Sequence, residues 1–270
     1  MPTIFPVIAI LLYLGASALL ATQLWQGSRD SVVPVVGRSG LLAGWSLAVV
    51  FHGVTIYGDA FTATGIDMGF FNSLSLAAWL IALLLLVASL RHPLELLGVI
   101  LLPFAGLALA LELAFPGPGA PTTLPPGLQI HILLSLLAYS LLAIAAIQAI
   151  LLAVQNHQLH HHHPGGFIRA LPPLAMMEGM LFQIIGLGFV FLSASLLTGF
   201  IYLQDLFGQH VVHKTVFSIA AWGLFATLLF GHWRFGWRGR LASRWTLGGF
   251  AALVVAYFGS KLVLELVLGR

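Results

Sequence analysis

The feature that most constrains this chain is a succession of eight apolar runs, each close to the roughly 20 residues that an α-helix needs to cross a bilayer. Within each run the apolar residues are continuous rather than alternating with polar ones, which excludes a membrane β-barrel. The predicted spans are residues 3–25, 39–61, 69–90, 94–115, 128–154, 179–203, 213–233 and 245–268. The sequence therefore predicts an all-α, polytopic membrane helical bundle that forms a single integral membrane domain over 1–270.

The composition supports this class. Hydrophobic residues make up 60% of the chain and charged residues only 7%, against about 25% charged residues in soluble domains. The chain has no cysteine, which excludes disulfides, thiol catalysis and thiolate-bound metal. The first run lacks a basic segment before it, so we expect a membrane span there rather than a cleavable signal peptide.

The basic residues lie at the ends of the apolar runs and strongly favour one side. The connections after the first, third, fifth and seventh runs contain eight arginines: Arg29, Arg38, Arg91, Arg169, Arg234, Arg238, Arg240 and Arg244. The opposite side has only Lys214 and Arg270. This bias predicts that both termini lie outside the cytoplasm and that the protein is a multi-pass protein of the inner (plasma) membrane. Basic residues at the ends of the runs, rather than in one patch, indicate no nucleic-acid partner. We expect Arg238 and Arg240 to lie in a loop and to contact lipid phosphates.

Three of the eleven histidines lie in the predicted outer half of three different runs: His52, His131 and His213. Ionisable residues are rare within spans and indicate a functional site. The alternative is that each histidine only hydrogen-bonds to a neighbouring helix. His210 is expected in the adjoining loop. A separate tract, His160–His163, lies on the predicted cytoplasmic side, where it could bind divalent metal or simply be a solvated loop.

The chemistry of histidine without cysteine leaves haem, zinc, copper or a quinone open as ligands. Zinc usually requires a fourth ligand, or an acid and a base nearby. A porphyrin requires one or two axial imidazoles and an apolar, aromatic slot. The aromatic residues that could line such a slot, or form ordinary packing and an interfacial belt, are Phe51, Tyr57, Phe61, Phe70, Phe71, Phe200, Tyr202 and Phe207.

Three stretches of the chain resemble a known family. "LPPGLQIHILLSLLAYSLL", "HKTVFSIAAWGLFATLLFGHWRFGWRGRLA" and "YFGSKLVLELVLG" are similar to segments of the cytochrome c assembly family (the CcsA/CcmC/HemX-like haem-handling proteins), closest to its YpjD/HemX-like branch. The resemblance is clear over roughly 128–268. It implies haem as the cofactor, b-type and bound non-covalently. It also implies that His131 is a ligand of the haem iron. His213 begins another inward-running span at the same predicted outer level, so we expect His131 and His213 to be the two axial ligands. His52 lies deeper and is expected as a cofactor-binding residue that could replace either one.

The chain departs from the cytochrome c synthases of that family in several respects, of which the segment before His213 is the clearest. Where those enzymes have a tryptophan-rich loop that presents haem, this chain has "LQDLFGQHVVHKT", without tryptophan or proline. We therefore expect a haem-binding or haem-handling protein that does not itself form the covalent bond, and favour a non-catalytic role. The expected partners are haem and the lipid bilayer, with another membrane protein or an apocytochrome as further candidates. Two alternatives stay open: a structural subunit of another membrane complex, and a divalent-metal transport accessory.

Overall fold

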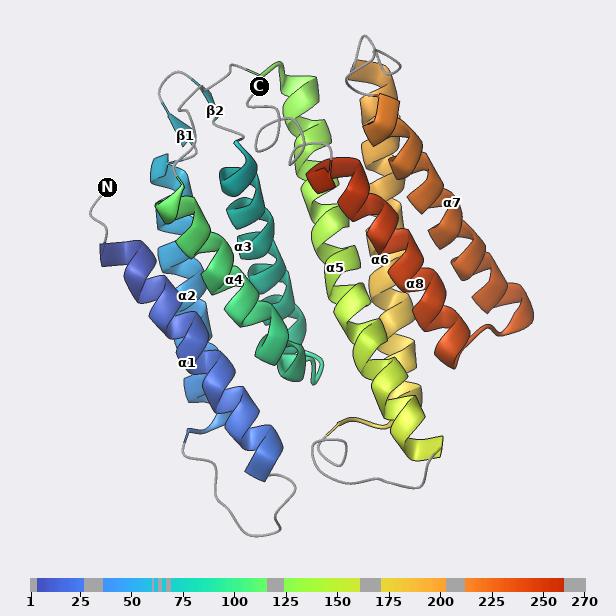
Figure 1. The fold of residues 1–270 in the computed structure, drawn as a ribbon, viewed down its shortest axis with the longest axis horizontal. Helices are drawn as coiled ribbons and strands as arrows, with labels where there is room; N and C mark the ends of the chain where they lie inside the picture. Colours follow the sequence, from blue (N-terminus) through green and yellow to red (C-terminus); the bar gives the residue numbers. More distant parts are fainter. Residues whose placement is uncertain are drawn as a thin grey trace. The chain divides into compact units, whose positions relative to one another are not determined.

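Eight long α-helices dominate the part of the chain that the structure, a computed structural model, describes (Figure 1). The described residues are 4–26, 36–59, 61–62, 65–66, 69–115, 124–160, 171–202 and 212–259. The helices are α1 (Ile4–Gln26), α2 (Arg38–Asp59), α3 (Phe70–Ser89), α4 (Gly98–Ala114), α5 (Pro126–His160), α6 (Leu174–Tyr202), α7 (Val212–Phe235) and α8 (Gly239–Val254). A short 3₁₀ segment, η1 (Glu95–Leu97), precedes α4, and a π-helical segment, η3 (Val255–Gly259), extends α8.

All eight predicted spans are confirmed as helices. Each helix is long and apolar enough to cross a membrane, with η1 counted as part of the α4 span and η3 as part of the α8 span. The described strands are two residues each, β1 (Phe61–Thr62) and β2 (Gly65–Ile66), and pair antiparallel between α2 and α3. Such a small ribbon leaves the protein in the all-α class, as predicted.

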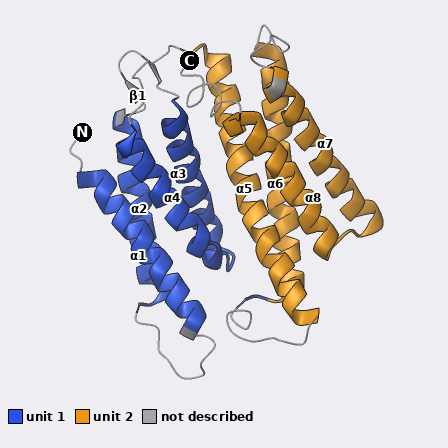
Figure 2. Ribbon diagram, viewed as in Figure 1, with its two compact units in different colours: residues 1–123, 161–172 blue, residues 124–160, 173–270 orange. Residues whose placement is uncertain are grey.

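The chain divides into two compact units (Figure 2). Unit 1 contains residues 1–123 and 161–172, and unit 2 contains residues 124–160 and 173–270. The single integral membrane domain expected over 1–270 stays a prediction. Each unit is an up-and-down set of four helices, the arrangement that short connections favour.

In unit 1, α1 and α3 each pack against both α2 and α4, which closes a ring of four helices. Tyr13, Trp45 and Leu102 are fully buried in this ring. One ion pair fastens the end of the unit where α2 begins. The Arg38 guanidinium lies 2.6 Å from a carboxylate oxygen of Glu95 and also donates a hydrogen bond to the Ser89 carbonyl. Arg38 therefore joins α2 to the α3–α4 connection.

In unit 2, α5 and α7 each pack against both α6 and α8, again closing a ring of four helices. Leu142, Leu181 and Phe225 are fully buried in this unit. Within the membrane the hydrophobic effect does not distinguish a helix partner from lipid, so such packing depends on close fit and on hydrogen bonds between helices.

The largest differences from the predicted boundaries are in unit 2. The last span was predicted to begin at residue 245, but α8 begins at Gly239. Arg240 and Arg244 therefore lie on its first turns rather than in a loop. The fifth span was predicted to end at 154, but α5 continues to His160. Arginines obscured the start of α8, because a long arginine side chain can reach water from a helix whose backbone continues into the bilayer. At the end of α5, the mostly polar residues 155–160 continue the helix beyond its apolar run.

The predicted orientation can be tested by cysteine labelling, since the chain has no cysteine of its own. Ser39 and Gln129 are exposed, and the predicted orientation puts them on opposite sides of the membrane. We expect Gln129→Cys to react in whole cells with a membrane-impermeant thiol reagent and Ser39→Cys to react only after the membrane is opened. The opposite pattern would show that both termini lie in the cytoplasm.

Candidate functional site

His131 lies on the second turn of α5 and points one ring nitrogen at the backbone of α6. Its Nδ1 is 2.9 Å from the Ser195 carbonyl oxygen. A carbonyl only accepts hydrogen bonds, so Nδ1 carries the proton and donates it. Nε2 is then the unprotonated nitrogen, with its lone pair available, and it has no partner among the described residues. Histidines that bind metals usually donate the other ring N–H in this way, which fixes both the tautomer and the ring orientation.

A group of small polar residues holds this contact in place. The Ser135 hydroxyl donates to the His131 carbonyl and lies 2.7 Å from the Ser195 hydroxyl. The Thr198 hydroxyl donates to the Ser195 carbonyl and lies 3.4 Å from His131 Nδ1. The imidazole, two serines and a threonine thus form one hydrogen-bonded cluster between α5 and α6. We call these four residues, His131, Ser135, Ser195 and Thr198, the histidine cluster.

One turn further toward the start of α5, the side chain of Tyr202 on α6 lies directly against Gly127. A Cβ on Gly127 would lie 2.4 Å from the ring of Tyr202, the last residue of α6, so any larger residue at 127 would displace that ring. The close contact and the histidine cluster together hold this end of α5 against this end of α6. No motif in the sequence pointed to Ser135, Ser195 or Thr198. The one sequence feature that could have indicated them is a hydroxyl group within an apolar span.

His213 is the second residue of α7, at the end of unit 2 where α5 begins and α6 ends (Figure 1). The structure describes its backbone but not its side chain. The axial role expected for His213 therefore stays a prediction. His210 lies outside the described residues, as does most of the "LQDLFGQHVVHKT" segment.

His52 is placed differently, in the interior of unit 1. Its side chain is fully buried, with Nε2 2.9 Å from the Ser75 hydroxyl and Nδ1 3.3 Å from the Tyr13 hydroxyl. The Tyr13 ring also packs edge-on against the imidazole, with centroids 5.7 Å apart. Both ring nitrogens of His52 are engaged, on α1 and on α3. This geometry fits the alternative considered above, a histidine that joins neighbouring helices, and it leaves no nitrogen for a ligand in this structure.

The other histidines are outside these two groups. His92 is exposed in the connection between α3 and α4. Nδ1 of His232 lies 2.9 Å from the Trp237 carbonyl oxygen, so it is the donor there. His160 directs Nδ1 to the Asn156 carbonyl on its own helix, and His161–His163 lie outside the described residues. Among the described residues, no group of three or more histidine or acidic side chains is placed to hold a metal ion.

The aromatic residues expected to line a haem slot are dispersed. Phe51 stacks on Phe5, and Phe71 stacks on Phe115, both within unit 1. Phe200 is 72% exposed, as expected for a lipid-facing side chain. Near the histidine cluster in sequence, Tyr139 instead packs against Phe250 and Phe258, with ring centroids 5.4 and 5.3 Å away. For the side chains described, packing and an interfacial belt account for these positions. Those of Phe61 and Phe207 are outside the described part.

The eight spans define a polytopic helical membrane protein, and its His131 has one ring nitrogen without a partner among the described residues. The chain matches the family described as "Cytochrome C assembly protein" over residues 39–268. It belongs to that family, which confirms the resemblance found in the sequence. The match extends well before residue 128, where that resemblance becomes clear.

Several known proteins are similar to this chain over almost its full length. It is 33% identical over 266 residues to the inner membrane protein YpjD of Escherichia coli (strain K12), covering 93% of this chain and 98% of that protein. It is 30% identical to an uncharacterized 28.8 kDa protein of Azospirillum brasilense, covering 93% and 95%. It is 22% identical to the cytochrome c biogenesis protein CcsA of Rippkaea orientalis, covering 91% and 92%. No solved structure matches. The predicted inner-membrane location agrees with the name of the Escherichia coli relative.

The contrast between His52 and His131 gives a direct test. We expect His52→Ala to lower the thermal unfolding midpoint in detergent, because it leaves the buried Tyr13 and Ser75 hydroxyls without their partner, at about 1–3 kcal/mol for each unpaired group. We expect the haem content per folded molecule to be unchanged. The exposed His92→Ala is the control for both measurements. A variant of normal stability that has lost haem would instead make His52 a ligand.

Proposed function

We propose that this protein binds haem non-covalently, as b-type haem, in an outward-facing site at the end of unit 2 that contains the histidine cluster. The protein would hold haem or pass it to a partner in the inner membrane without forming a bond between haem and an apocytochrome. Membership of the cytochrome c assembly family supports a role in haem handling. The relatives named CcsA are cytochrome c biogenesis proteins by name.

One observation carries this proposal: the 2.9 Å contact between His131 Nδ1 and the Ser195 carbonyl. It assigns the proton to Nδ1 and leaves Nε2 with the lone pair that an iron ligand requires. It also holds the ring in one orientation, so little freedom is lost when a ligand binds. The fit requires no cluster of acidic side chains or other metal ligands, because a porphyrin supplies four of the iron's ligands itself.

His213 is the second axial ligand in this proposal. It comes from a different helix of the same unit, and its place near the start of α7 puts its backbone at the same end as His131. A bound haem supplies an iron centre that can accept one or two axial nitrogens and change its redox state. The chain's own contribution would be to supply the imidazoles and to fix the tautomer of His131.

The non-covalent character is supported by the sequence of the α6–α7 connection. The segment "LQDLFGQHVVHKT" lacks the tryptophan and proline of the loop that presents haem in the cytochrome c synthases. In this proposal, another protein forms the covalent bond between haem and the apocytochrome. An apocytochrome or a second membrane protein is the expected recipient.

The proposal predicts a specific spectrum. Purified protein should show a Soret band after expression with added haem precursor, and His131→Ala should abolish most of it. His213→Ala should shift the band toward that of a haem with one histidine ligand. Free imidazole should partly restore the spectrum of each variant by refilling the vacated axial position. Absorption spectra, together with haem content from pyridine extraction, provide the measurements.

His92→Ala is the matched control, because His92 is exposed and lies in unit 1. If His131→Ala and His213→Ala both keep the spectrum and haem content of the unchanged protein, the ligand assignment is wrong. A colourless protein under all conditions would instead favour the structural-subunit alternative.

The histidine tract provides an independent prediction. Replacing His160–His163 with serine should leave the haem content unchanged, since the tract follows the opposite end of α5 from His131. The same haem measurement decides it. A large loss of haem from this variant would place the tract on the route by which haem reaches the site.

A further inference from the structure

The turn between α7 and α8 is unusually rich in arginine and tryptophan. The stretch "GHWRFGWRGRLASRW", residues 231–245, contains four arginines and three tryptophans. We call this stretch the basic turn. It takes no part in the histidine cluster and lies at the other end of unit 2 (Figure 1).

The backbone of the basic turn is held by several contacts. Gly236 adopts a φ of 66°, a conformation that glycine reaches without strain, and its N–H donates to the His232 carbonyl. The next residue, Trp237, donates its own N–H to the Gly231 carbonyl. Its carbonyl accepts the Nδ1 hydrogen of His232 at 2.9 Å. The chain therefore leaves α7 in a defined direction and does not depend on a ligand for its shape.

Two contacts with α6 also hold this turn in place. The His232 ring stacks on Phe182, with centroids 3.5 Å apart. A carboxylate oxygen of Glu178 accepts the N–H of Gly239, the first residue of α8, at 2.8 Å. Glu178 is the acidic side chain that the described structure places against the basic turn, and it binds backbone there. It neutralises none of the arginines by direct contact.

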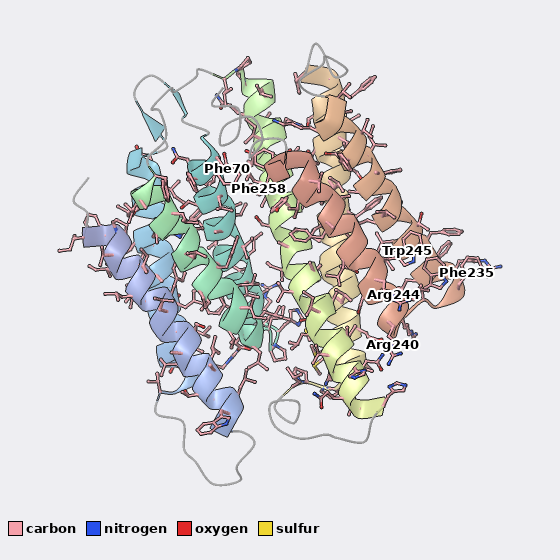
Figure 3. The ribbon with its side chains drawn as sticks, viewed as in Figure 1. Phe70, Phe235, Arg240, Arg244, Trp245 and Phe258 are labelled. Atoms are coloured by element: carbon pink, nitrogen blue, oxygen red, sulfur yellow. The ribbon has the colours of Figure 1, made fainter. Side chains whose placement is uncertain are left out.

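The four arginines are exposed and have no carboxylate partner among the described residues. Arg240 and Arg244 are exposed and lie one helical turn apart on α8, where Figure 3 labels them together with Trp245. The Arg234 guanidinium lies over the Phe235 ring, 5.9 Å from its centroid. Four like charges gathered within 11 residues repel one another, so the site gains from an anion that can contact more than one of them.

The aromatic residues of the basic turn indicate where it lies relative to a bilayer. Trp233 is 81% exposed and Phe235 66% exposed, and the Trp237 and Trp245 rings are 5.5 Å apart beside them. Tryptophan concentrates at the depth of lipid headgroups. The turn joins two membrane-spanning helices and so lies at the membrane surface. At that depth the abundant anions are headgroup phosphates.

We propose that the basic turn is a binding site for the phosphates of anionic phospholipids, with Arg240 and Arg244 as its principal contacts. Their planar guanidinium groups suit bidentate phosphate contacts. The exposed Trp233 and Phe235 would enter the lipid beside the bound headgroup. A soluble phosphate would contact the arginines but gain nothing from these apolar rings. This difference distinguishes a lipid headgroup phosphate from free phosphate.

The experiment uses the full chain in detergent micelles, titrated with phosphatidylglycerol, with phosphatidylcholine and with inorganic phosphate, and counts bound lipid by native mass spectrometry. We expect a clear preference for phosphatidylglycerol. Each arginine near an anionic surface is expected to change the affinity about fivefold. Arg240→Gln/Arg244→Gln should therefore lower the affinity for phosphatidylglycerol at least about fivefold and leave the affinity for phosphatidylcholine unchanged. Lysine at both positions should retain part of the affinity, since the charge remains and the planar fork is lost.

Arg91→Gln is the matched control, because it removes an exposed arginine from unit 1, in a stretch (residues 80–103) whose sequence contains no phenylalanine, tyrosine or tryptophan. An equal loss of affinity in this control would reduce the effect to net charge and overturn the proposal. Displacement of phosphatidylglycerol by millimolar inorganic phosphate would overturn it in favour of a soluble anion. Equal binding of the two lipids by the unchanged protein would also overturn it. If the double variant does not fold, the exposed Arg244→Gln alone carries the same comparison.

Discussion

The hydrocarbon core of a lipid bilayer offers no hydrogen-bond partner, so polar groups that enter it must find partners on the protein. The helices satisfy their own backbones. Several hydroxyls bond to a carbonyl one turn earlier on the same helix, as Thr55 does with Phe51 and Ser193 with Phe189. Longer side chains reach across to a neighbour, as Trp79 does when it donates to the Val49 carbonyl. The two internal histidines differ in how far this requirement is met.

His52 meets it fully and His131 only in part. The Tyr13 and Ser75 hydroxyls occupy both nitrogens of His52, and the ring is fully buried. The Ser195 carbonyl occupies one nitrogen of His131. His131 is half-buried, and its Nε2 has no partner among the described residues. An imidazole held in one orientation with its lone pair available is what an iron ligand requires, which is the physical reason for connecting His131 with haem.

The eight spans could be predicted because each is a long, uninterrupted apolar run, and the family could be recognised from the order of motifs in the C-terminal half. The different hydrogen-bonding of His52 and His131 could not be predicted. Both are single histidines in apolar helices, and what distinguishes them is which residues of other helices face them. Ser195 lies 64 positions from His131, and no local pattern indicates that α5 and α6 pair at that register. The early start of α8 was missed for a different reason: arginines near a helix end resemble a loop until the backbone is seen.

The group that orients His131 is a main-chain carbonyl, and this affects how the site can change. Every residue placed at position 195 has that carbonyl, so no side-chain replacement there deletes the acceptor. A mutational scan would detect His131 itself and would largely pass over the contact that fixes its tautomer. A replacement at position 195 would remove the buried hydroxyl that bonds to Ser135, but not the carbonyl that accepts the hydrogen of His131. Only a change in the path of α6, such as a proline that bends it or a residue too large to pack against α5, would move the acceptor away.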